Sequence, residues 1–368
     1  MEFAKIRDVC TFLPKSKIKA GEGLEEGLYY FFTSSDIKVL KINEYLFDDE
    51  VVILGTGGKP SCNYYNGKFS ISTDNFVLKS SKINMKYLYY FLRNNNLSIL
   101  DKGFRGAGLK HISKDYVCDI KIPIIALNDQ AKIVEELDLL NNNIKLYNNQ
   151  IQYLDDIVKS QFFEMSENKE KNTLFIDCVE RMTKGPFGSA VKKELYVPES
   201  DDAYKVYIQI NCIQKNELLG DYFISEDYFN SKMKSFEVKP NDYLITCDGT
   251  LGKYVRLSNN PRKGIISASL LRIQLREDVM LPEYFEVMWD EYLLDKLKGK
   301  VRNGCLTHLP SANVIGNEYI YLPSMSEQII FSNYKKQIDK LKITVQKQID
   351  LLEELLELKM NEYFGDRV

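Results

Sequence analysis

The sequence repeats itself at long range, and this repeat limits the possible folds more than any other feature. Gln130 and Gln328 are 198 residues apart, and the same offset relates Leu154 to Leu352. The offset holds without a gap over more than thirty residues. Self-similarity at a fixed offset is typical of a chain built from copies of one structural unit. We therefore expect the order globule, helix, globule, helix.

The repeat continues upstream of the helical runs with small insertions. Residues 105–112 parallel residues 302–309 at an offset of 197, which aligns the two histidines of the chain, His111 and His308. The second globule is longer than the first near its start, around residues 185–229. The two globules are therefore expected to share a fold but to differ in their loops.

Two helical runs are the strongest secondary-structure prediction. In each run apolar residues recur at alternating steps of three and four, which is the spacing of a coiled-coil seam. The second run has one additional four-residue step, a stutter. The predicted seam residues are Leu137, Leu140, Ile144, Tyr147, Ile151, Leu154 and Val158 in the first run, and Ile338, Leu341, Val345, Ile349, Leu352 and Leu356 in the second. The runs can pair with each other, or each can pack on its own globule.

The globules are predicted to be mixed α/β, so that the fold class is α+β. Runs rich in β-branched and aromatic residues predict strands, and Gly, Asn and Pro separate them. The expected strands are 51–54, 69–72, 207–210 and 269–273, and the expected helices of the globules are 85–94 and 282–297. The expected domains are 1–127 and 169–325 for the globules, and 128–168 and 326–368 for the long helices.

Composition excludes several classes of protein. The formal net charge is −3, from 49 Lys+Arg against 52 Asp+Glu, which rules out a histone-like polycation but not a local basic face. No apolar run approaches the ~18–20 residues of a membrane helix. The seven cysteines are spread along the chain without a C-x-x-C pair. A disulfide framework or zinc ribbon would need such pairing, so we expect free thiols and a cytoplasmic protein.

Motifs that would carry catalysis are not found in the sequence. Residues 55–60 and 249–254 are glycine-rich and contain a lysine, but neither has the spacing of a phosphate-binding P-loop. There is also no dinucleotide-binding glycine pattern, no amino-methyltransferase tetrapeptide and no hydrolase or metalloprotease motif. The adjacent acids at 48–49 and 201–202 are expected to be solvated turns. We therefore expect a binding protein without a catalytic centre, and without a metal or cofactor.

Several segments together resemble one protein family. These are Leu322 to Gln328 and its counterpart before Gln130, Gly185 to Ser189, and Lys359 to Gly365. In this order, over essentially the whole chain, they resemble the specificity subunit of type I restriction–modification systems. The first long run departs from the pattern at its end, where residues 166–167 are Ser-Glu in place of the Phe-Gly at 364–365.

The resemblance implies a specific function. Each globule would be a target recognition domain that reads one half of a bipartite DNA site. The two long helices would pair antiparallel, separate the two domains and dock methyltransferase subunits, two of them. S-adenosylmethionine would be bound by those methyltransferase subunits, and ATP and Mg²⁺ by restriction subunits that join the same complex. The specificity subunit itself would hold no cofactor and would not be an enzyme.

This arrangement suits double-stranded DNA. An antiparallel helix pair would relate the two globules by an approximate two-fold axis, as the strands of a duplex are related. A helix of about 35 residues extends roughly 50 Å, more than one duplex turn of ~34–36 Å, so that unread base pairs would separate the half-sites. Because the globules differ in sequence, we expect an asymmetric target.

Candidate DNA contacts are basic or amide residues of predicted loops. Lys and Arg would neutralise phosphates, and Arg or Asn could read base edges. The candidates are Lys15, Lys17, Lys19, Lys59, Asn63, Lys68, Arg105 and Lys110 in the first globule, and Lys184, Lys192, Lys193, Lys253, Arg256, Arg262, Lys263 and Arg302 in the second. A solvated surface charge is the alternative for each. For His111 and His308 we favour a structural role, packing the last loop against the long helix.

Two other functions stay open at this point. One is a coiled-coil scaffold whose globules bind protein partners, and the other is an enzyme with an unrecognised site. Leu351, Leu355 and Leu358 lie off the seam of the second run. We expect some of them to pack on a methyltransferase subunit, although packing on the second globule is an alternative. Neither the recognised DNA sequence nor the spacing of its halves follows from the sequence.

Overall fold

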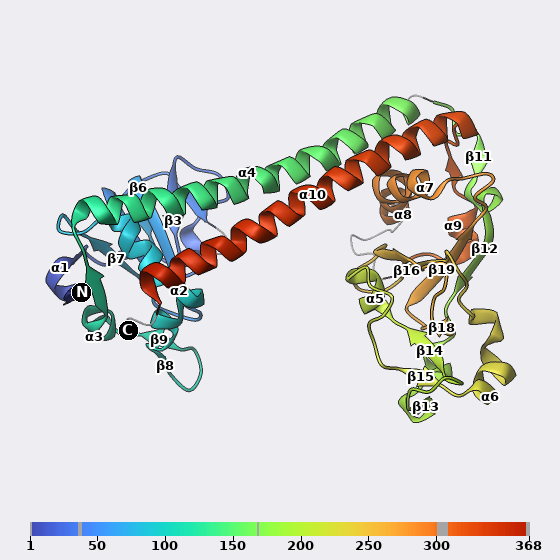
Figure 1. Cartoon of the computed structure of the whole chain (residues 1–368), viewed down its shortest axis with the longest axis horizontal. Helices are drawn as coiled ribbons and strands as arrows, with labels where there is room; N and C mark the ends of the chain where they lie inside the picture. The colour runs from blue at the N-terminus through green and yellow to red at the C-terminus, as the bar shows by residue number, and fades with distance from the viewer. Residues whose placement is uncertain (1, 36–38, 168, 300–307, 366–368) are drawn as a thin grey trace. The chain divides into compact units, whose positions relative to one another are not determined.

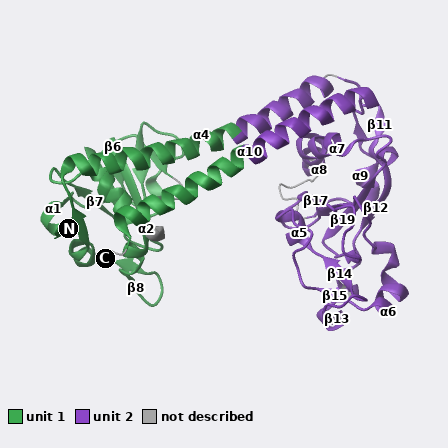
Figure 2. Cartoon of the chain, in the orientation of Figure 1, with its two compact units in different colours: residues 1–150, 345–368 green, residues 151–344 purple. Residues whose placement is uncertain are grey.

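The computed structural model describes residues 2–35, 39–167, 169–299 and 308–365 (Figure 1). The chain divides into two compact units, which contain Met1–Gln150 with Val345–Val368, and Ile151–Thr344 (Figure 2). We call them unit 1 and unit 2. Each unit holds one globule and about half of each long helix. Within the described ranges, no helix is both long and apolar enough to cross a membrane.

Unit 1 is built on a six-stranded sheet. Its strands are β2 (Thr11–Phe12), β3 (Tyr29–Phe32), β4 (Leu40–Ile42), β5 (Phe47–Gly55), β6 (Ser61–Ile71) and β7 (Asn75–Lys79). Their order is β2-β7-β5-β6-β3-β4, and β3 pairs parallel with β6 while the other pairs are antiparallel. Val52 and Leu54 of β5 pack in a different cluster from Val51 and Ile53. Successive side chains of a strand point to opposite faces, which explains why this apolar run is buried throughout.

A helix and several short elements complete unit 1. Helix α2 (Met85–Asp101) begins at Asn84, whose side chain accepts hydrogen bonds from the backbone N–H groups of Lys86 and Tyr87. Its buried residues Leu88 and Phe91 pack in the cluster that contains Val52. The short elements are β1 (Glu2–Lys5), α1 (Ile6–Val9), η1 (Ala20–Glu22), β8 (Phe104–Arg105), β9 (His111–Ile112), α3 (Lys114–Asp119) and β10 (Lys121–Ile124).

Unit 2 contains two four-stranded sheets. Their strands are β12 (Val179–Lys184), β19 (Leu270–Leu275), β16 (Tyr243–Thr246) and β17 (Tyr254–Arg256) in the first, and β13 (Tyr196–Val197), β15 (Phe223–Ile224), β14 (Tyr204–Tyr207) and β18 (Gly264–Ile266) in the second. The other elements are β11 (Thr173–Leu174), η2 (Phe175–Cys178), η3 (Gly188–Ala190), η4 (Lys193–Leu195), α5 (Gln209–Ile213), α6 (Glu226–Tyr228), η5 (Phe229–Met233), η6 (Lys234–Phe236), α7 (Pro282–Met288), η7 (Trp289–Leu293), α8 (Leu294–Gly299), α9 (Ala312–Gly316) and β20 (Tyr319–Ile320).

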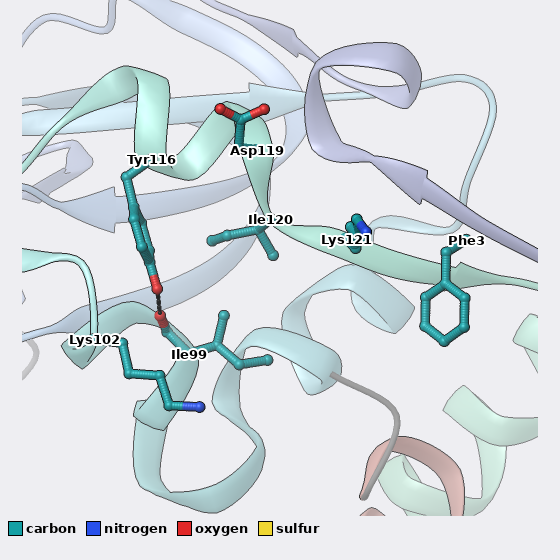
Figure 3. Close-up of a pocket in the computed structure, with 7 residues that line it drawn as sticks. All are labelled: Phe3, Ile99, Lys102, Tyr116, Asp119, Ile120 and Lys121. Carbon is teal, nitrogen blue, oxygen red and sulfur yellow. Dashed lines mark hydrogen bonds between the residues drawn. The ribbon is translucent and has the colours of Figure 1, made fainter.

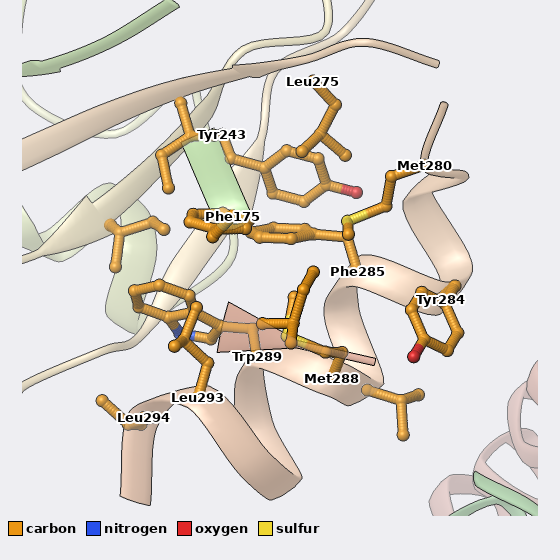
Figure 4. Packing of buried hydrophobic residues seen from close by; sticks show 14 of the residues in the cluster. Phe175, Tyr243, Leu275, Met280, Tyr284, Phe285, Met288, Trp289, Leu293 and Leu294 are labelled. Atoms are coloured by element: carbon orange, nitrogen blue, oxygen red, sulfur yellow. The ribbon is translucent and has the colours of Figure 1, made fainter. Parts of the chain in front are cut away.

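Aromatic packing forms the main core of unit 2 (Figure 4). The rings of Phe175 and Phe285 stack with their centroids 6.0 Å apart. Trp289 is fully buried, and its indole N–H donates a hydrogen bond of 3.0 Å to the carbonyl of Gly252. This bond satisfies the polar group of a large buried ring and fixes the turn before β17 against the helical segment.

The two globules share one strand order, which confirms the predicted internal repeat. The order β2-β7-β5-β6 of unit 1 corresponds to β12-β19-β16-β17 of unit 2. The parallel pair of β3 and β6 corresponds to the parallel pair of β14 and β18. The long strand β6 of unit 1 is thus represented by two shorter strands, β17 and β18, in unit 2. This break separates the strands of unit 2 into two sheets.

One strand prediction is wrong. Residues 207–210 were expected to be extended, but β14 ends at Tyr207 and α5 begins at Gln209. The reason is local: the side chain of Asn211 accepts a hydrogen bond of 2.9 Å from the backbone N–H of Ile208. This bond caps the first turn of a helix in a segment whose composition favours a strand.

The long helices are α4 (Leu127–Ser166) and α10 (Met325–Phe364), with 40 residues each. Helix α10 begins with a capping box, in which the backbone N–H of Ser324 donates to a carboxylate oxygen of Glu327, and the Glu327 N–H donates to the Ser324 hydroxyl. Each helix runs through both units without interruption (Figure 2). The predicted long helical runs are therefore present.

The helices pair antiparallel within each unit, as expected. In unit 2, Lys342 forms an ion pair with Asp155, while the rings of Phe331 and Phe162 lie 6.5 Å apart. From Asp155 to Phe162 the residue numbers rise along α4, while those of the contacting residues fall along α10 from Lys342 to Phe331. The two helices therefore run in opposite directions. In unit 1, Lys359 forms an ion pair of 3.2 Å with Glu136.

The predicted seam differs from the structure at one residue. All seven seam residues of α4 are buried or half-buried. On α10, Leu341 is 52% exposed, and Lys342 takes the inward position between the buried Ile338 and Val345. Ile338, Lys342 and Val345 are separated by steps of four and three, whereas the predicted path through Leu341 has steps of three and four. Both paths fit the spacing of a coiled-coil seam. The aliphatic stem of Lys342 can lie inward while its ammonium group reaches Asp155, so that periodicity alone selects the wrong neighbour.

Candidate nucleic-acid interface

In unit 1, two loops between strands are joined by backbone hydrogen bonds. The N–H of Gly58 donates to the carbonyl of Lys110 at 2.9 Å, and the N–H of Ile112 donates to the carbonyl of Thr56 at 3.1 Å. Gly58 has a φ of +88°, a conformation that glycine adopts without strain. The turn between β5 and β6 is thus held against residues 105–112.

A third and a fourth segment join the same loops. The N–H of Thr56 donates to the carbonyl of Asp74, and the N–H of Thr73 donates to the carbonyl of Ile18, both at 2.9 Å. The stretch 15–19 therefore lies beside the turn after β6. We call residues 15–19, 55–60, 72–74 and 105–111 the unit 1 loop cluster.

Most of the predicted contacts of the first globule belong to this cluster. Those within it are Lys15, Lys17, Lys19, Lys59, Arg105 and Lys110, all of them exposed. Among the described residues, none of these side chains has an ion-pair partner. Asn63 is half-buried on β6, and Lys68 lies opposite Asp48 with its ammonium group 4.7 Å from the ring of Tyr45. The structure thus brings six of the eight candidates together and separates Lys68 from them.

The corresponding turn of unit 2 is held in the same way. The N–H of Leu309 donates to the carbonyl of Cys247 at 2.8 Å, and Nδ1 of His308 lies 2.6 Å from a carboxylate oxygen of Asp248. Lys184 donates to the carbonyl of Leu309 at 3.4 Å, which places it at this turn. Lys253 lies at the end of the turn and is exposed.

Other candidates in unit 2 contact the chain itself. Arg256 forms an ion pair of 2.6 Å with Glu277, and Arg262 donates to the carbonyl of Ser200 at 2.5 Å. Lys263 lies over the ring of Tyr204. Lys192 and Lys193 are exposed at η4, and Arg302 lies outside the described residues. Arg256 and Arg262 therefore have structural partners that compete with a DNA contact.

The two histidines were expected to pack the last loop against a long helix, but in the structure they pair with other loops. His111 forms an isolated bridge to Gly57, and His308 forms the equivalent bridge to Asp248. Each thus pairs with the glycine-rich turn of its own globule and not with a long helix. The equivalent bridges explain why the repeat aligns the two histidines.

Paired glutamines have a role that sequence reasoning missed, although the repeat marked them. Gln130 accepts a hydrogen bond from the N–H of Asn84 and donates to the carbonyl of Ile125, both at 2.9 Å. Gln328 accepts from the N–H of Leu281 at 2.8 Å and donates to the carbonyl of Pro323. Each glutamine is buried and joins the first turn of its long helix to the N-terminus of a shorter helix. Gln130 joins α4 to α2, and Gln328 joins α10 to α7.

Metal-binding clusters and reactive cysteines are two features that would indicate catalysis. No three His, Cys, Asp or Glu side chains there are placed to hold a metal ion. Burial raises the pKa of the thiols of Cys10, Cys178, Cys212 and Cys247 to about 12, so these are poor nucleophiles. The six described cysteines form no disulfide.

A largely apolar pocket of about 470 Å³ lies in unit 1 (Figure 3). The hydroxyl of Tyr116 donates to the carbonyl of Ile99 at its edge, and Asp119 forms ion pairs with Lys5 and Arg7. None of the predicted DNA contacts lines this pocket. It therefore adds nothing to the loop cluster.

Comparisons with known proteins agree with this architecture. Residues 1–155 match the family model "Type I restriction modification DNA specificity domain". The EcoDI specificity subunit of Escherichia coli is 30% identical over 147 residues, which are 40% of this chain and 33% of that protein. The match thus spans a third of that relative's length. The MjaVIII specificity subunit of Methanocaldococcus jannaschii is 23% identical over 92% of this chain and 83% of its own length.

Solved structures show the same fold. The S subunit of a type I system from M. genitalium has a TM-score of 0.61 at 14% identity and covers 100% of this chain and 96% of its own. A chain from a structure of type I complex assembly has a TM-score of 0.59 at 13% identity, with 100% and 98% covered. Residues 1–155 are therefore similar to the DNA specificity domain of type I restriction–modification proteins, and the whole chain has the fold of the S subunit from M. genitalium.

Proposed function

We propose that this chain is the DNA-binding specificity subunit of a type I restriction–modification complex, with each globule reading one half of a bipartite site. The observation that carries the proposal is the duplicated fold in which both copies fasten a glycine-rich turn against the segment around a histidine. In unit 1 this places six exposed basic side chains in one loop cluster. Such a cluster suits the phosphates of a duplex.

The two copies differ in the chemistry of these turns, which supports an asymmetric target. The residue that bridges to the histidine is Gly57 in unit 1 and Asp248 in unit 2, so that a carboxylate stands in only one of the two places. A carboxylate can accept a hydrogen bond from cytosine but repels phosphate, while lysine favours phosphate or guanine. Unlike side chains in equivalent places would therefore select unlike half-sites.

The long helices would act as spacer and docking surface for methyltransferase subunits, two of them. S-adenosylmethionine, ATP and Mg²⁺ would be bound by partner subunits and not by this chain. Specificity subunits are non-catalytic members of their complexes, and we infer the same role here. Turnover of S-adenosylmethionine or DNA by the isolated chain would contradict this inference.

Binding to duplex libraries at several salt concentrations tests the proposal. We expect affinity to fall steeply with salt, because each neutralised phosphate adds about 0.9 to the log–log slope. Replacing both Lys59 and Lys110 with Gln should lower that slope by about two without changing the preferred sequence strongly. The control is Lys145→Gln, a substitution of an exposed lysine on α4 outside the loop cluster.

The alternative is a coiled-coil scaffold whose globules bind proteins. It is favoured by the exposed apolar residues Leu351 and Leu358 on α10. A scaffold would bind duplexes weakly and without sequence preference, even with a methyltransferase subunit present. That result would replace the proposed function.

A further inference from the structure

The loop after β12 holds the most exposed large apolar side chain of the described residues. Phe187 is 90% exposed, whereas the next in order, Leu218, is 76% exposed. Phe187 belongs to Gly185 to Ser189, one of the segments that carry the family resemblance. Moving a phenyl ring out of water is favourable. A ring that the chain leaves in water is therefore favoured to bind an apolar surface of a partner.

The backbone on both sides of the ring is fixed. Before it, Pro186 is buried and its ring restricts φ. A Cβ on Gly185 would lie 1.9 Å from the carbonyl oxygen of Ser267, so that only glycine fits there. After it, the N–H of Ala190 donates to the carbonyl of Phe187 at 2.8 Å. The ring is thus held in solvent by an ordered loop.

The loop of Phe187 begins where other turns of unit 2 meet. Lys184 donates to the carbonyl of Leu309 at 3.4 Å, and the N–H of Leu309 donates to the carbonyl of Cys247 at 2.8 Å. The N–H of Cys247 donates in turn to the carbonyl of Ser269 at 2.8 Å. We call residues 184–190, 247–253, 267–269 and 308–309 the unit 2 loop cluster.

This cluster is the counterpart of the unit 1 loop cluster. Thr56 and Cys247 make the same two backbone hydrogen bonds. Each accepts from the residue that follows the histidine and donates to the turn before β7 or β19. The loops after β2 and β12 also correspond, because these strands take the same place in the two strand orders. Phe187 therefore lies in the part of unit 2 that is equivalent to the proposed DNA-binding loops of unit 1.

The two equivalent loops differ in chemistry. The loop after β2 exposes Lys15, Lys17 and Lys19, and its large apolar side chains are at most half-exposed. The loop after β12 exposes Phe187 instead. A phenyl ring cannot neutralise a phosphate, so the loop of unit 2 must contact its partner in another way.

The charges of the unit 2 loop cluster indicate the class of partner. Lys184 and Lys253 outnumber Asp248, the single acid in these ranges. A carboxylate oxygen of Asp248 lies 2.6 Å from Nδ1 of His308. A duplex offers phosphates to the lysines and the flat faces of its bases to an aromatic ring. The combination of lysines and an exposed ring therefore suits DNA.

We propose that Phe187 inserts at one base-pair step of the half-site that unit 2 reads and stacks on a base there. The inference rests on the proposed function and names a residue that reads sequence without a hydrogen bond. An apolar side chain that wedges between bases partly unstacks and kinks the duplex. The cost of this deformation is lowest at flexible pyrimidine–purine steps, so that the ring selects such a step through its deformability. Unit 1, with lysines in the equivalent loop, has no wedge.

Removing the ring tests the proposal. The probe is the duplex selected from the library, bound by the full-length chain at a saturating concentration of its methyltransferase subunit. Phe187→Ala should weaken the Kd about tenfold or more, the effect of losing one base–aromatic stack. The log–log salt slope should stay unchanged, because the ring neutralises no phosphate. Phe187→Tyr should keep the wild-type Kd, since it retains the aromatic ring.

Two controls separate DNA binding from folding. Leu218→Ala should leave the Kd unchanged, because Leu218 is an exposed apolar residue of unit 2 outside the loop cluster. In urea unfolding followed by Trp289 fluorescence, Phe187→Ala should be as stable as the wild type, since a ring already in water loses no packing. A destabilised Phe187→Ala would show that the ring packs on this chain, which would overturn the inference.

A second measurement locates the ring on the DNA. Library selection with Phe187→Ala should relax the preference at one base-pair step, in one half-site only. A fluorescent adenine analogue that brightens on unstacking, placed at that step, should be brighter in the wild-type complex than in the Phe187→Ala complex. An adenine flipped out by the methyltransferase subunit would respond in both complexes and is thereby distinguished.

The remaining outcomes separate this inference from the proposed function. Wild-type affinity and selection in Phe187→Ala would overturn the inference and leave the proposed function intact. Weaker co-purification with the methyltransferase subunit, at unchanged affinity for the duplex, would assign the ring to that subunit and would also overturn it. If the unaltered chain with its methyltransferase subunit selected no duplex, the proposed function itself would fail.

Discussion

At the scale of single residues, unit 2 holds a fully buried Arg–Asp pair. Nε of Arg272 lies 3.8 Å from a carboxylate oxygen of Asp242, and the same oxygen accepts a hydrogen bond of 2.7 Å from the N–H of Lys239. Burial raises the pKa of Asp242 to about 6, although the Lys239 hydrogen bond and Arg272 oppose this effect. The loss of hydration of the ionised carboxylate therefore outweighs its electrostatic attraction to the guanidinium of Arg272.

This pair predicts a pH dependence of stability. The pKa of Asp242 is about 6 in the folded chain against an ordinary value of 3.8, so the folded state binds the proton more tightly. The contribution of Asp242 to the free energy of unfolding should therefore rise as the pH falls from about 6 to about 4, by on the order of 2–3 kcal/mol. Asp242→Asn should remove this rise. Urea unfolding followed by the fluorescence of Trp289, the single tryptophan, reports on unit 2.

The test is the difference in stability between the wild type and Asp242→Asn at each pH, because all other carboxylates titrate in both proteins and cancel in the difference. The wild type should gain stability relative to Asp242→Asn between pH 7 and pH 4. A constant difference over this range would show that Asp242 is ionised in the folded state throughout, and would contradict its raised pKa.

The buried glutamines predict a local loss of stability. Gln328→Leu leaves the N–H of Leu281 without its acceptor inside the protein. We expect the free energy of unfolding of unit 2 to fall by about 1–3 kcal/mol, the cost of an unsatisfied buried group. The matched control is Gln337→Leu, which alters an exposed glutamine on the same helix and should have little effect. Equal stability of the two variants in urea would exclude a clamp at Gln328.

At the scale of elements, the outer face of α10 is uncovered by the chain itself. Leu351, Leu355 and Leu358 are 65%, 40% and 60% exposed. They therefore do not pack on a globule of this chain, which was the alternative considered from the sequence. Exposed leucines on one helix are available to a partner.

We predict that these leucines contribute to docking. Replacing Leu351 and Leu358 with Gln should leave the unfolding transition nearly unchanged, because both side chains are already exposed. It should weaken co-purification with the methyltransferase subunit about tenfold or more, if the face is buried in the complex. Leu218→Gln, an exposed apolar residue outside the helices, is the control. Undiminished co-purification of the double variant would remove this face from the docking surface.

At the scale of the whole molecule, the fold is a duplication joined by two helices of equal length. Both helices are continuous from one unit into the other. A gap of unread base pairs between the half-sites stays a prediction of the duplicated architecture, as do the four domain boundaries proposed from the sequence.

Deleting one heptad at matched positions of both helices tests the spacer role. Seven residues shorten a helix by about 10 Å, which equals roughly three base pairs at 3.4 Å each. We expect the half-sites preferred by the variant to lie about three base pairs closer together in a methylation or binding assay on a randomised spacer library. A variant that folds, binds DNA and keeps the original spacing would show that the helices do not measure it.

Some of this architecture follows from the sequence alone. The offset between Gln130 and Gln328 predicts two copies of one unit, and the heptad spacing predicts two long helices. The repeat can be recognised by comparing the sequence with itself. The heptad spacing can be recognised because a helix buries side chains at regular intervals along the chain. The apolar run 51–54 likewise predicts a strand that is buried on both faces.

The tertiary structure decided which side chains meet. The place of Lys342 in the seam depends on Asp155 of the other helix, and the helix at Gln209 depends on a cap that composition does not show. The loop cluster depends on backbone hydrogen bonds between segments that are far apart in the sequence, such as the one between Gly58 and Lys110. Periodicity determines the spacing of residues along one element, whereas contacts between elements depend on packing and hydrogen bonding in three dimensions.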